Sequence, residues 1–244
     1  MTGARAPVEP PSTGVRFPDP KRVPRDIIAV GTDYRPGTIL QAYRMGIFPW
    51  PQSDDLVGWF SPDPRTVLPL DALHWSRSLR RTLRKHPYRI TVDTAFRATM
   101  QACGQEREEG TWITPGMLDA YEELHRLGWA HSLEVWEECR TLERSESSDS
   151  VGKDKELVGG IYGIAIGAAF AAESMFHRRT DASKIALATL AERLRDGGYE
   201  LFDAQVMNPH LASLGFVEIR RSEYLRRLER AIAKRPAKPI CSWA

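Results

Sequence analysis

Two polar side chains on an apolar stretch, Asp203 and Gln205, are the first candidates for chemistry. The stretch 199–206 predicts a β-strand, in which residues two apart share a face, so the two side chains lie next to each other. Burying a carboxylate and an amide without partners costs about 1–3 kcal/mol each. The pair is therefore either a structural network that holds Asn208 and the following turn, or a catalytic site. Spacing alone leaves both readings open.

A second candidate, Glu173-Ser174, ends a long apolar run and precedes Met175. A carboxylate at the end of a strand could bind a cation, and it could equally be a solvated strand terminus. Trp50 and Trp112 lie in predicted loops, where an aromatic side chain lines a pocket more often than it does elsewhere. These residues are candidates for substrate contacts.

Positive charge gathers in two places, although the chain as a whole has a net charge of only +2. Between residues 76 and 89 there is no acidic residue, and the predicted helix carries Arg77, Arg80, Arg81, Arg84, Lys85 and Arg89. A second stretch, 220–238, has eight Lys or Arg against two Glu. Solvated helix faces usually carry both signs, so this segregation favours contacts with a phosphate backbone in the first stretch, whereas in the second stretch a solvated face is the stronger interpretation.

Several other kinds of site have no signature in the sequence. The six histidines show no metal-ligand spacing, the three cysteines do not form a disulfide framework, and no glycine-rich phosphate loop is present. No cofactor is expected. The sequence has neither a run of about 18 apolar residues nor an apolar signal-peptide core, so we expect no membrane contact and a cytoplasmic location.

The elements that must position these residues indicate an α/β (α+β) fold. We expect a flexible proline-rich arm at 1–24, a small N-terminal domain at 25–64 and a mixed α/β domain at 65–244. In the last of these, Asp181 is expected to cap a helix that ends at Gly197 and Gly198. The acidic segment 143–155 has almost no apolar residue and predicts a flexible hairpin insertion.

Eight stretches of the chain, in one order from about residue 30 to 224, resemble the bacterial leucyl/phenylalanyl-tRNA–protein transferases. They are 42–50 (AYRMGIFPW), 61–65 (SPDPR), 108–114 (EEGTWIT), 131–136 (HSLEVW), 157–163 (LVGGIYG), 173–176 (ESMF), 182–184 (ASK) and 213–215 (SLG). The chain departs from the usual pattern at Ala172, His177 and Ala204, and its acidic insertion is longer.

The resemblance implies an acetyltransferase-like (GNAT-like) C-terminal domain and a smaller N-terminal domain. It implies a monomer that transfers Leu or Phe, and less well Met, from aminoacyl-tRNA to proteins that begin with Lys or Arg, marking them for degradation.

The resemblance also implies roles for individual residues. Asp203 and Gln205 are the catalytic pair, with Asn208 beside them, and Glu173 with Ser174 meets the basic end of the acceptor. The aminoacyl group and the terminal adenosine are expected to contact Trp50, Trp112, Ile161, Phe170 and Leu187. The basic helix, with Arg77, Arg80, Arg81, Arg84 and Lys85, is expected to bind tRNA.

Two other functions compete with this hypothesis. A coenzyme-A-dependent N-acetyltransferase would have a similar fold, but it needs a glycine-containing pyrophosphate loop, and residues 177–181 (HRRTD) contain no glycine. A non-catalytic RNA-binding module would use the basic helix, but it leaves Asp203, Gln205 and Glu173 without a role.

Overall fold

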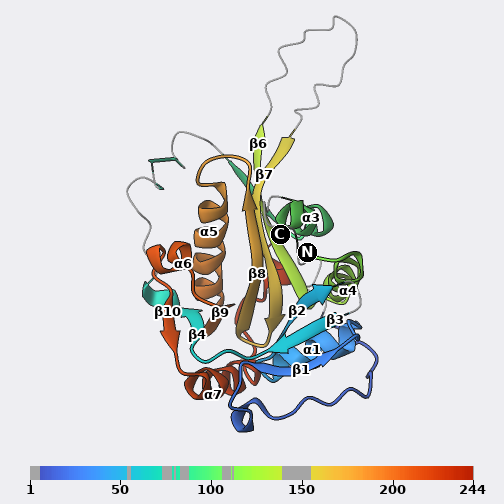
Figure 1. Ribbon diagram of the computed structural model, residues 1–244. Helices are drawn as coiled ribbons and strands as arrows, with labels where there is room; N and C mark the ends of the chain where they lie inside the picture. The colour runs from blue at the N-terminus through green and yellow to red at the C-terminus, as the bar shows by residue number, and fades with distance from the viewer. Residues whose placement is uncertain are drawn as a thin grey trace, which may run out of the picture.

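The computed structural model describes residues 6–53, 56–72, 79, 81–82, 88–105, 111, 113–138 and 155–243. Its strands form two sheets, one of seven strands in the order β10-β4-β9-β8-β7-β6-β5 and one of three in the order β1-β3-β2 (Figure 1). The strands of the large sheet are β4 (Arg65–Leu68), β5 (Arg89–Val92), β6 (Ala130–Glu138), β7 (Lys155–Ile166), β8 (Ala169–His177), β9 (Leu201–Gln205) and β10 (Val217–Ile219). Those of the small sheet are β1 (Ile27–Gly31), β2 (Phe48–Ser53) and β3 (Leu56–Phe60).

Neighbouring strands of the large sheet are antiparallel except β8 and β9, which are parallel. A parallel pair needs a crossover, and α5 (Ala182–Gly197) provides it. The tight turn between β7 and β8 places Gly167 at a φ of +56°, where a Cβ would meet the carbonyl oxygen of Ile232 at 2.5 Å. Glycine therefore fits this turn.

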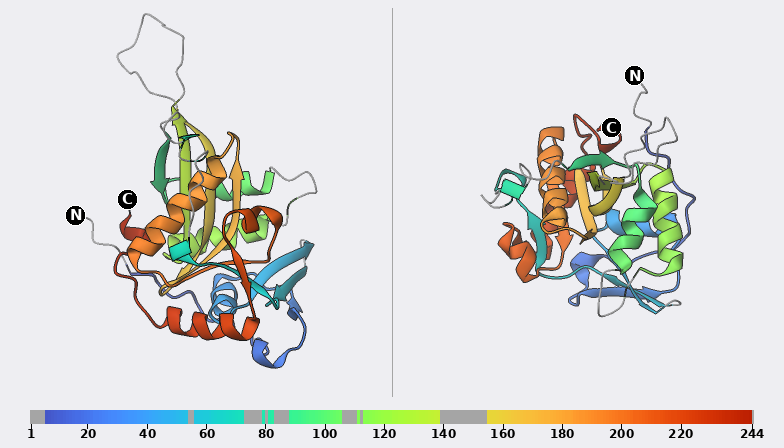
Figure 2. Two further views of the ribbon diagram at one scale, coloured as in Figure 1. Left: turned by 90° about the vertical axis from the view of Figure 1, so that its left-hand side faces the viewer. Right: turned by 90° about the horizontal axis from the view of Figure 1, so that it is seen from above.

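Helices cover both faces of the large sheet (Figures 1 and 2). One face packs on α5 and shares its core with Leu187, Leu190 and Phe202. The opposite face packs on α3 (Phe96–Gln105) and α4 (Pro115–Arg126), whose core continues through α1 (Pro36–Arg44) into the small sheet. The remaining helical segments are η1 (Pro20–Arg22), η2 (Leu70–Ala72), α6 (Pro209–Ser213), α7 (Arg221–Ile232) and η3 (Ile240–Ser242).

A buried arginine joins α7 to the N-terminal part of the chain. The guanidinium of Arg221 donates to the backbone carbonyls of Val23 at 2.6 Å, Arg25 at 2.8 Å and Ser61 at 2.7 Å. Since Arg221 is the first residue of α7, these bonds hold the small sheet against the end of the chain.

The N-terminal segment follows the surface of these elements. Val8 accepts from the indole of Trp129 at 2.8 Å and donates its own N–H to Leu127 at 2.9 Å. Thr13 and Thr38 share a hydroxyl contact of 2.6 Å, and Pro20 is buried. The mobility expected for residues 1–24 stays a prediction.

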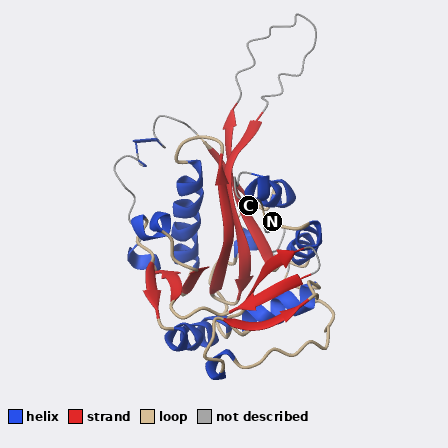
Figure 3. Ribbon diagram, viewed as in Figure 1, coloured by secondary structure: helices blue, strands red, loops and turns tan. Residues whose placement is uncertain are grey.

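The secondary structure agrees with most of the expected elements, as Figure 3 shows for the helices around the central strands. One detail of the cap differs. Asp181 precedes α5 as predicted, but its φ is +66° and its side chain makes no capping bond to the helix backbone. Its carboxylate instead accepts from Lys184 at 2.9 Å and Thr82 at 3.1 Å.

The acidic insertion falls almost wholly outside the described residues, and the basic helix does so in large part. In the portion of the chain that is described, no helix combines the length and the apolar character needed to cross a membrane.

Candidate active site

A cavity of about 440 Å³ opens between the ends of β8 and β9, helices α5 and α6, and strand β2. Its polar lining groups are those of Glu173, Ser174, Gln205 and Asn208, and Glu173 and Gln205 are hydrogen-bonded to each other. We call this part of the lining the polar end and the remainder the apolar end. The remaining lining residues are Phe48, Pro49, Trp50, Ile161, Ala172, Met175, Leu187, Ala204, Val206, Met207, Leu211 and Phe216. A largely apolar cavity with a few convergent polar groups is typical of a binding site for a small group.

Glu173 reaches the cavity because β8 contains a bulge. Tyr162 pairs with Ser174 and Gly163 pairs with Ala172, so Glu173 is an extra residue that opposes none in β7. A bulge bends its strand and redirects a side chain, and bulges are frequent beside active sites. The irregular register therefore places this carboxyl group in the cavity wall.

Gln205 ends β9 in an unusual backbone conformation, with a φ of +57°. The left-handed region costs a non-glycine residue about 1–3 kcal/mol, so the surroundings must hold it. Its backbone N–H donates to Oδ1 of Asp203 at 3.0 Å, and its side-chain Nε2 donates to Oε1 of Glu173 at 3.2 Å. Both ends of the residue are fixed, and the amide faces the cavity.

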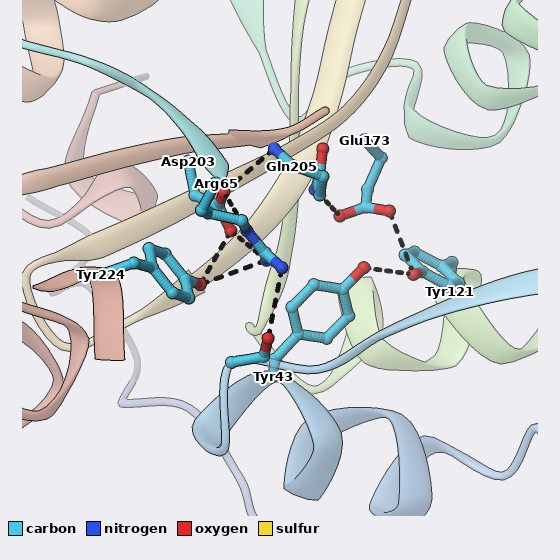
Figure 4. A network of polar contacts seen from close by, with 8 residues as sticks. Tyr43, Arg65, Tyr121, Glu173, Asp203, Gln205 and Tyr224 are labelled. Atoms are coloured by element: carbon cyan, nitrogen blue, oxygen red, sulfur yellow. Dashed lines mark hydrogen bonds and ion pairs between the residues drawn. The ribbon is translucent and has the colours of Figure 1, made fainter. Parts of the chain in front are cut away.

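Asp203 lies behind Gln205 in a buried network (Figure 4). Its carboxylate accepts four hydrogen bonds, from Nε of Arg65 at 2.8 Å, from Nη2 of Arg65 at 2.6 Å, from the hydroxyl of Tyr224 at 2.9 Å and from the Gln205 N–H. It is 2% exposed and does not line the cavity. The geometry therefore favours a positioning role for Asp203, which acts on Gln205 from behind.

The partner of Asp203 is Arg65, which is fully buried. Its guanidinium stacks between the rings of Phe48 at 4.9 Å and Tyr224 at 4.4 Å, and it donates to the carbonyl of Gly46 at 3.2 Å. Burial lowers the pKa of Arg65, but the adjacent Asp203 carboxylate reverses this effect, so the pKa is raised above its usual value. The pair is a charged, fully hydrogen-bonded unit.

The carboxyl group of Glu173 has a different environment. Burial raises its pKa to about 8, and the Asp203 charge adds to the rise, while a hydrogen bond from Tyr121 at 3.4 Å opposes it. Tyr121 in turn shares a 2.9 Å hydroxyl contact with Tyr43, and burial raises the pKa of both tyrosines well above 10. Near neutral pH the carboxyl group of Glu173 is therefore mostly protonated.

The structure brings most of the expected site residues together. Ile161 and Leu187 line the apolar end, and Trp50 stands half-exposed at the mouth. Asn208 caps α6 by accepting from the N–H of Leu211 at 2.8 Å, so part of its polarity serves the fold.

Of the described residues that were expected to contact the aminoacyl group, the adenosine or the acceptor, Phe170 does not reach the cavity. It is 1% exposed, does not line the cavity and packs edge-to-face on Phe202 at 5.6 Å, in the core behind Ile161. Phe170 lies on the same side of β8 as Ala172, which lines the cavity, but two residues further along the strand, where its ring packs on Phe202 in the core. Trp112 lies outside the described residues, as do Arg77, Arg80, Arg84 and Lys85, and Arg81 is exposed.

The sequence did not single out Tyr43, Arg65, Tyr121 or Tyr224. Arg65 and Tyr43 occur in two of the stretches that carry the family resemblance, which was the available signal. Tyr121 and Tyr224 sit at helix positions that pattern alone assigns to the core. Among the described residues, no cluster of three or more His, Cys, Asp or Glu side chains could hold a metal ion.

Comparisons with known proteins agree on one family. The model of the family described as leucyl/phenylalanyl-tRNA protein transferase matches residues 67–229, and that of its N-terminal domain matches residues 32–63. A leucyl/phenylalanyl-tRNA–protein transferase of Shewanella baltica (strain OS185) is 46% identical over 228 residues, covering 91% of this chain and 89% of the relative.

Another relative with the same name, from Shigella dysenteriae serotype 1 (strain Sd197), is 46% identical over 217 residues, with 88% and 86% covered. Among solved structures, L-PGS from Bacillus licheniformis has a TM-score of 0.38 and 13% identity, over 70% of this chain and 50% of that one. These last values are too low to support an argument.

The buried pair makes a prediction about stability. Arg65→Ala should lower the free energy of unfolding by about 3–5 kcal/mol, because it leaves the Asp203 carboxylate buried without its cation. The double variant Arg65→Met, Asp203→Leu should recover part of this loss. Urea unfolding measures both.

The control is Arg97→Ala, which removes an exposed ion pair with Asp119 and Glu122 and should cost under about 1 kcal/mol. If the destabilisation by Arg65→Met and that by Asp203→Leu simply add in the double variant, the two side chains are not coupled as described.

Proposed function

The chain belongs to the leucyl/phenylalanyl-tRNA protein transferase family, and from this premise we propose that the cavity beside Gln205 is where its transfer reaction takes place. The protein is an aminoacyltransferase, which moves an amino acid from aminoacyl-tRNA to a protein. The observation that supports this location for the reaction is the fixed position of Gln205. Its amide is held by Glu173 and its backbone by Asp203, at the polar end of an otherwise apolar cavity.

The reaction is aminolysis of an ester. The neutral α-amine of the acceptor forms a C–N bond with the ester carbonyl carbon, the C–O bond to the ribose breaks, and the proton lost from nitrogen ends on the ribose oxygen. The pKa of an α-amine is about 7.7–8.0, so an appreciable fraction is neutral near neutral pH without a strong base. Holding the two reactants in contact can then supply much of the rate.

Gln205 is placed to orient the acceptor amine. Its Nε2 is engaged by Glu173, so its Oε1 accepts an N–H of the α-amine and aims the nitrogen lone pair at the ester. Asp203 acts one step further back, because its carboxylate fixes the backbone of Gln205 and is itself saturated by Arg65 and Tyr224. We assign it a positioning role and no proton transfer.

The donor's side chain, Leu or Phe and less well Met, fits the apolar end. Ile161 and Leu187 line this end together with Met175, Leu211 and Phe216. Phe170 supports Ile161 from the core instead of touching the donor. Trp50 at the mouth, with Trp112, is proposed to contact the terminal adenosine.

The acceptor's first residue is proposed to be Lys or Arg, as in proteins marked for degradation through their N-terminus. Glu173 is the carboxyl group in the cavity wall, and with Ser174 beside it a cationic side chain finds a partner there. A bound cation stabilises the carboxylate and draws the pKa of Glu173 down from its raised value.

Further proposals concern the whole chain. We propose an acetyltransferase-like architecture for residues 65–244 and a separate small domain at 25–64, acting as a monomer. Because aminoacyl-tRNA is made and used in the cytoplasm, we propose that compartment. Family membership favours this function over a coenzyme-A-dependent acetyltransferase or a non-catalytic RNA-binding module.

The direct test offers labelled Leu-tRNA or acetyl-coenzyme A, in parallel, with a peptide that begins with Arg. We expect transfer from Leu-tRNA alone. Gln205→Ala should lower kcat about a hundredfold, within the range of positioned proton-contacting groups, while the affinity for tRNA is kept. Acetylation of the peptide, or full activity of Gln205→Ala, would contradict the proposal.

The raised pKa of Glu173 predicts an unusual pH profile. With an Arg-starting peptide, kcat/KM requires Glu173 ionised and the α-amine neutral, and the two groups have pKa values near 8. Activity should therefore rise between pH 6 and 7 with a logarithmic slope of about 2 in the native chain and about 1 in Glu173→Gln. A bell-shaped profile in the native chain would mean instead that Glu173 takes the proton of the α-ammonium group itself.

The basic helix predicts a salt effect. Replacing Arg80, Arg81, Arg84 and Lys85 with Ala should weaken tRNA binding and reduce its salt slope by about 0.7–0.9 for each phosphate that the variant no longer binds. Transfer from an aminoacyl-adenosine analogue, which lacks most phosphates, should be unchanged. An unchanged salt slope would make this helix a solvated face only.

A further inference from the structure

An apolar, solvent-facing surface lies on the small sheet, directly beside the cavity mouth. Of the seven large apolar residues that are exposed in the described part of the chain, four are on this sheet. They are Ile27 and Val30 on β1, Trp50 on β2 and Leu56 on β3. We call these four residues and Phe60 the apolar face.

The strand register places these side chains on one side of the sheet. Gly58 pairs with Val30 on one side and with Trp50 on the other, so the three residues form one row across the strands. The ring of Phe60 covers the middle of this row, because a Cβ at Gly58 would lie only 2.5 Å from Cε2 of Phe60. Val30 is 57% exposed and Trp50 44%, and neither is charged.

The apolar face is continuous with the cavity. Trp50 belongs to both, since it also lines the mouth, and Phe48 behind it lies 6.4 Å from the Trp50 ring and 6.2 Å from the Phe60 ring, centre to centre. A chain whose first residue enters the cavity therefore meets the apolar face as it leaves.

We propose that this face binds the apolar residues that follow the N-terminal residue of the acceptor polypeptide. The inference rests on the proposed function, and it adds a second specificity determinant outside the cavity. Residues of this kind are exposed in unfolded or partly unfolded chains, so the face selects acceptors by their accessible N-terminal segment as well as by their first residue.

Charge favours a polypeptide over the single-stranded end of tRNA. A nucleic-acid strand needs cations along its phosphates, and the five residues of the apolar face include none. Within the stretch that carries the proposed tRNA cations, the described residue Thr82 donates to Asp181 at 3.1 Å, at the start of α5. The small sheet lies toward the other end of the large sheet (Figure 1).

Contact through the face, and not through the β2 edge that adjoins the cavity, follows from the sequence of β2. Pro49 and Pro51 have no N–H to offer, so this edge strand cannot pair regularly with a further strand. The acceptor is therefore recognised by its side chains on the apolar face.

The test compares three acceptors: an Arg-Gly dipeptide amide, an Arg-starting decapeptide with Leu and Val at positions 2–5, and the same decapeptide with Ser and Gly there. For the native chain we expect kcat/KM to be about tenfold higher for the apolar decapeptide than for the polar one, as one well-buried apolar side chain can supply. Val30→Asp and Val30→Lys should both remove this advantage. Neither variant should change kcat/KM for the dipeptide or the KM for aminoacyl-tRNA.

Val8→Asp is the matched control, a valine of similar exposure (44%) on the N-terminal segment, and it should leave all values unchanged. If Val30→Asp weakens aminoacyl-tRNA binding and Val30→Lys strengthens it, the face binds nucleic acid and the proposal is wrong. Equal use of both decapeptides by the native chain also overturns it. If the native chain transfers an amino acid to none of the three acceptors, the proposed function itself is wrong. This result differs from the two outcomes that would overturn only the role of the apolar face.

Discussion

The buried ion pair between Arg65 and Asp203 is the interaction on which the geometry of the site depends. An isolated charge at this depth would be strongly unfavourable, so each partner requires the other and both require their hydrogen bonds. Asp203 meets this requirement with four donors, and Arg65 adds two aromatic rings and a backbone carbonyl. Because one of those four donors is the backbone of Gln205, the stability of the core is linked to the position of a side chain that faces the cavity.

Two local irregularities then carry that rigidity to the cavity. The bulge in β8 turns Glu173 inward, and the left-handed backbone at Gln205 ends β9 with its amide beside Glu173. Neither is a favoured conformation for a regular strand, and both lie at the polar end of the cavity. Strain of this kind persists only where the surroundings fix it, which is the function of the network behind.

Sequence reasoning predicted the elements with clear ends, such as the helix α5 and the strand β9, and the shared face of Asp203 and Gln205. It could not predict that Asp203 is saturated by Arg65, because the two residues are 138 positions apart and nothing local links them. The resemblance assigned Phe170 to the substrate, whereas the structure places its ring in the core. The inward turn of Glu173 was equally hidden, because it depends on a one-residue bulge in β8. A bulge is set by the neighbouring strand, and periodicity within β8 does not reveal it.

The distances along the chain within this network have a consequence for the order of synthesis. Arg65 donates hydrogen bonds to Gly46, which is near the beginning of the chain, and to Tyr224, which lies 159 residues after Arg65. On a ribosome the chain emerges from its N-terminus, so β4 and the small sheet are present long before α7 can close the network. Gln205 is itself synthesised late, shortly before Tyr224, so this residue and the network that supports it are completed together near the end of synthesis. The network behind the cavity is therefore complete only when α7 has folded back onto the first part of the chain.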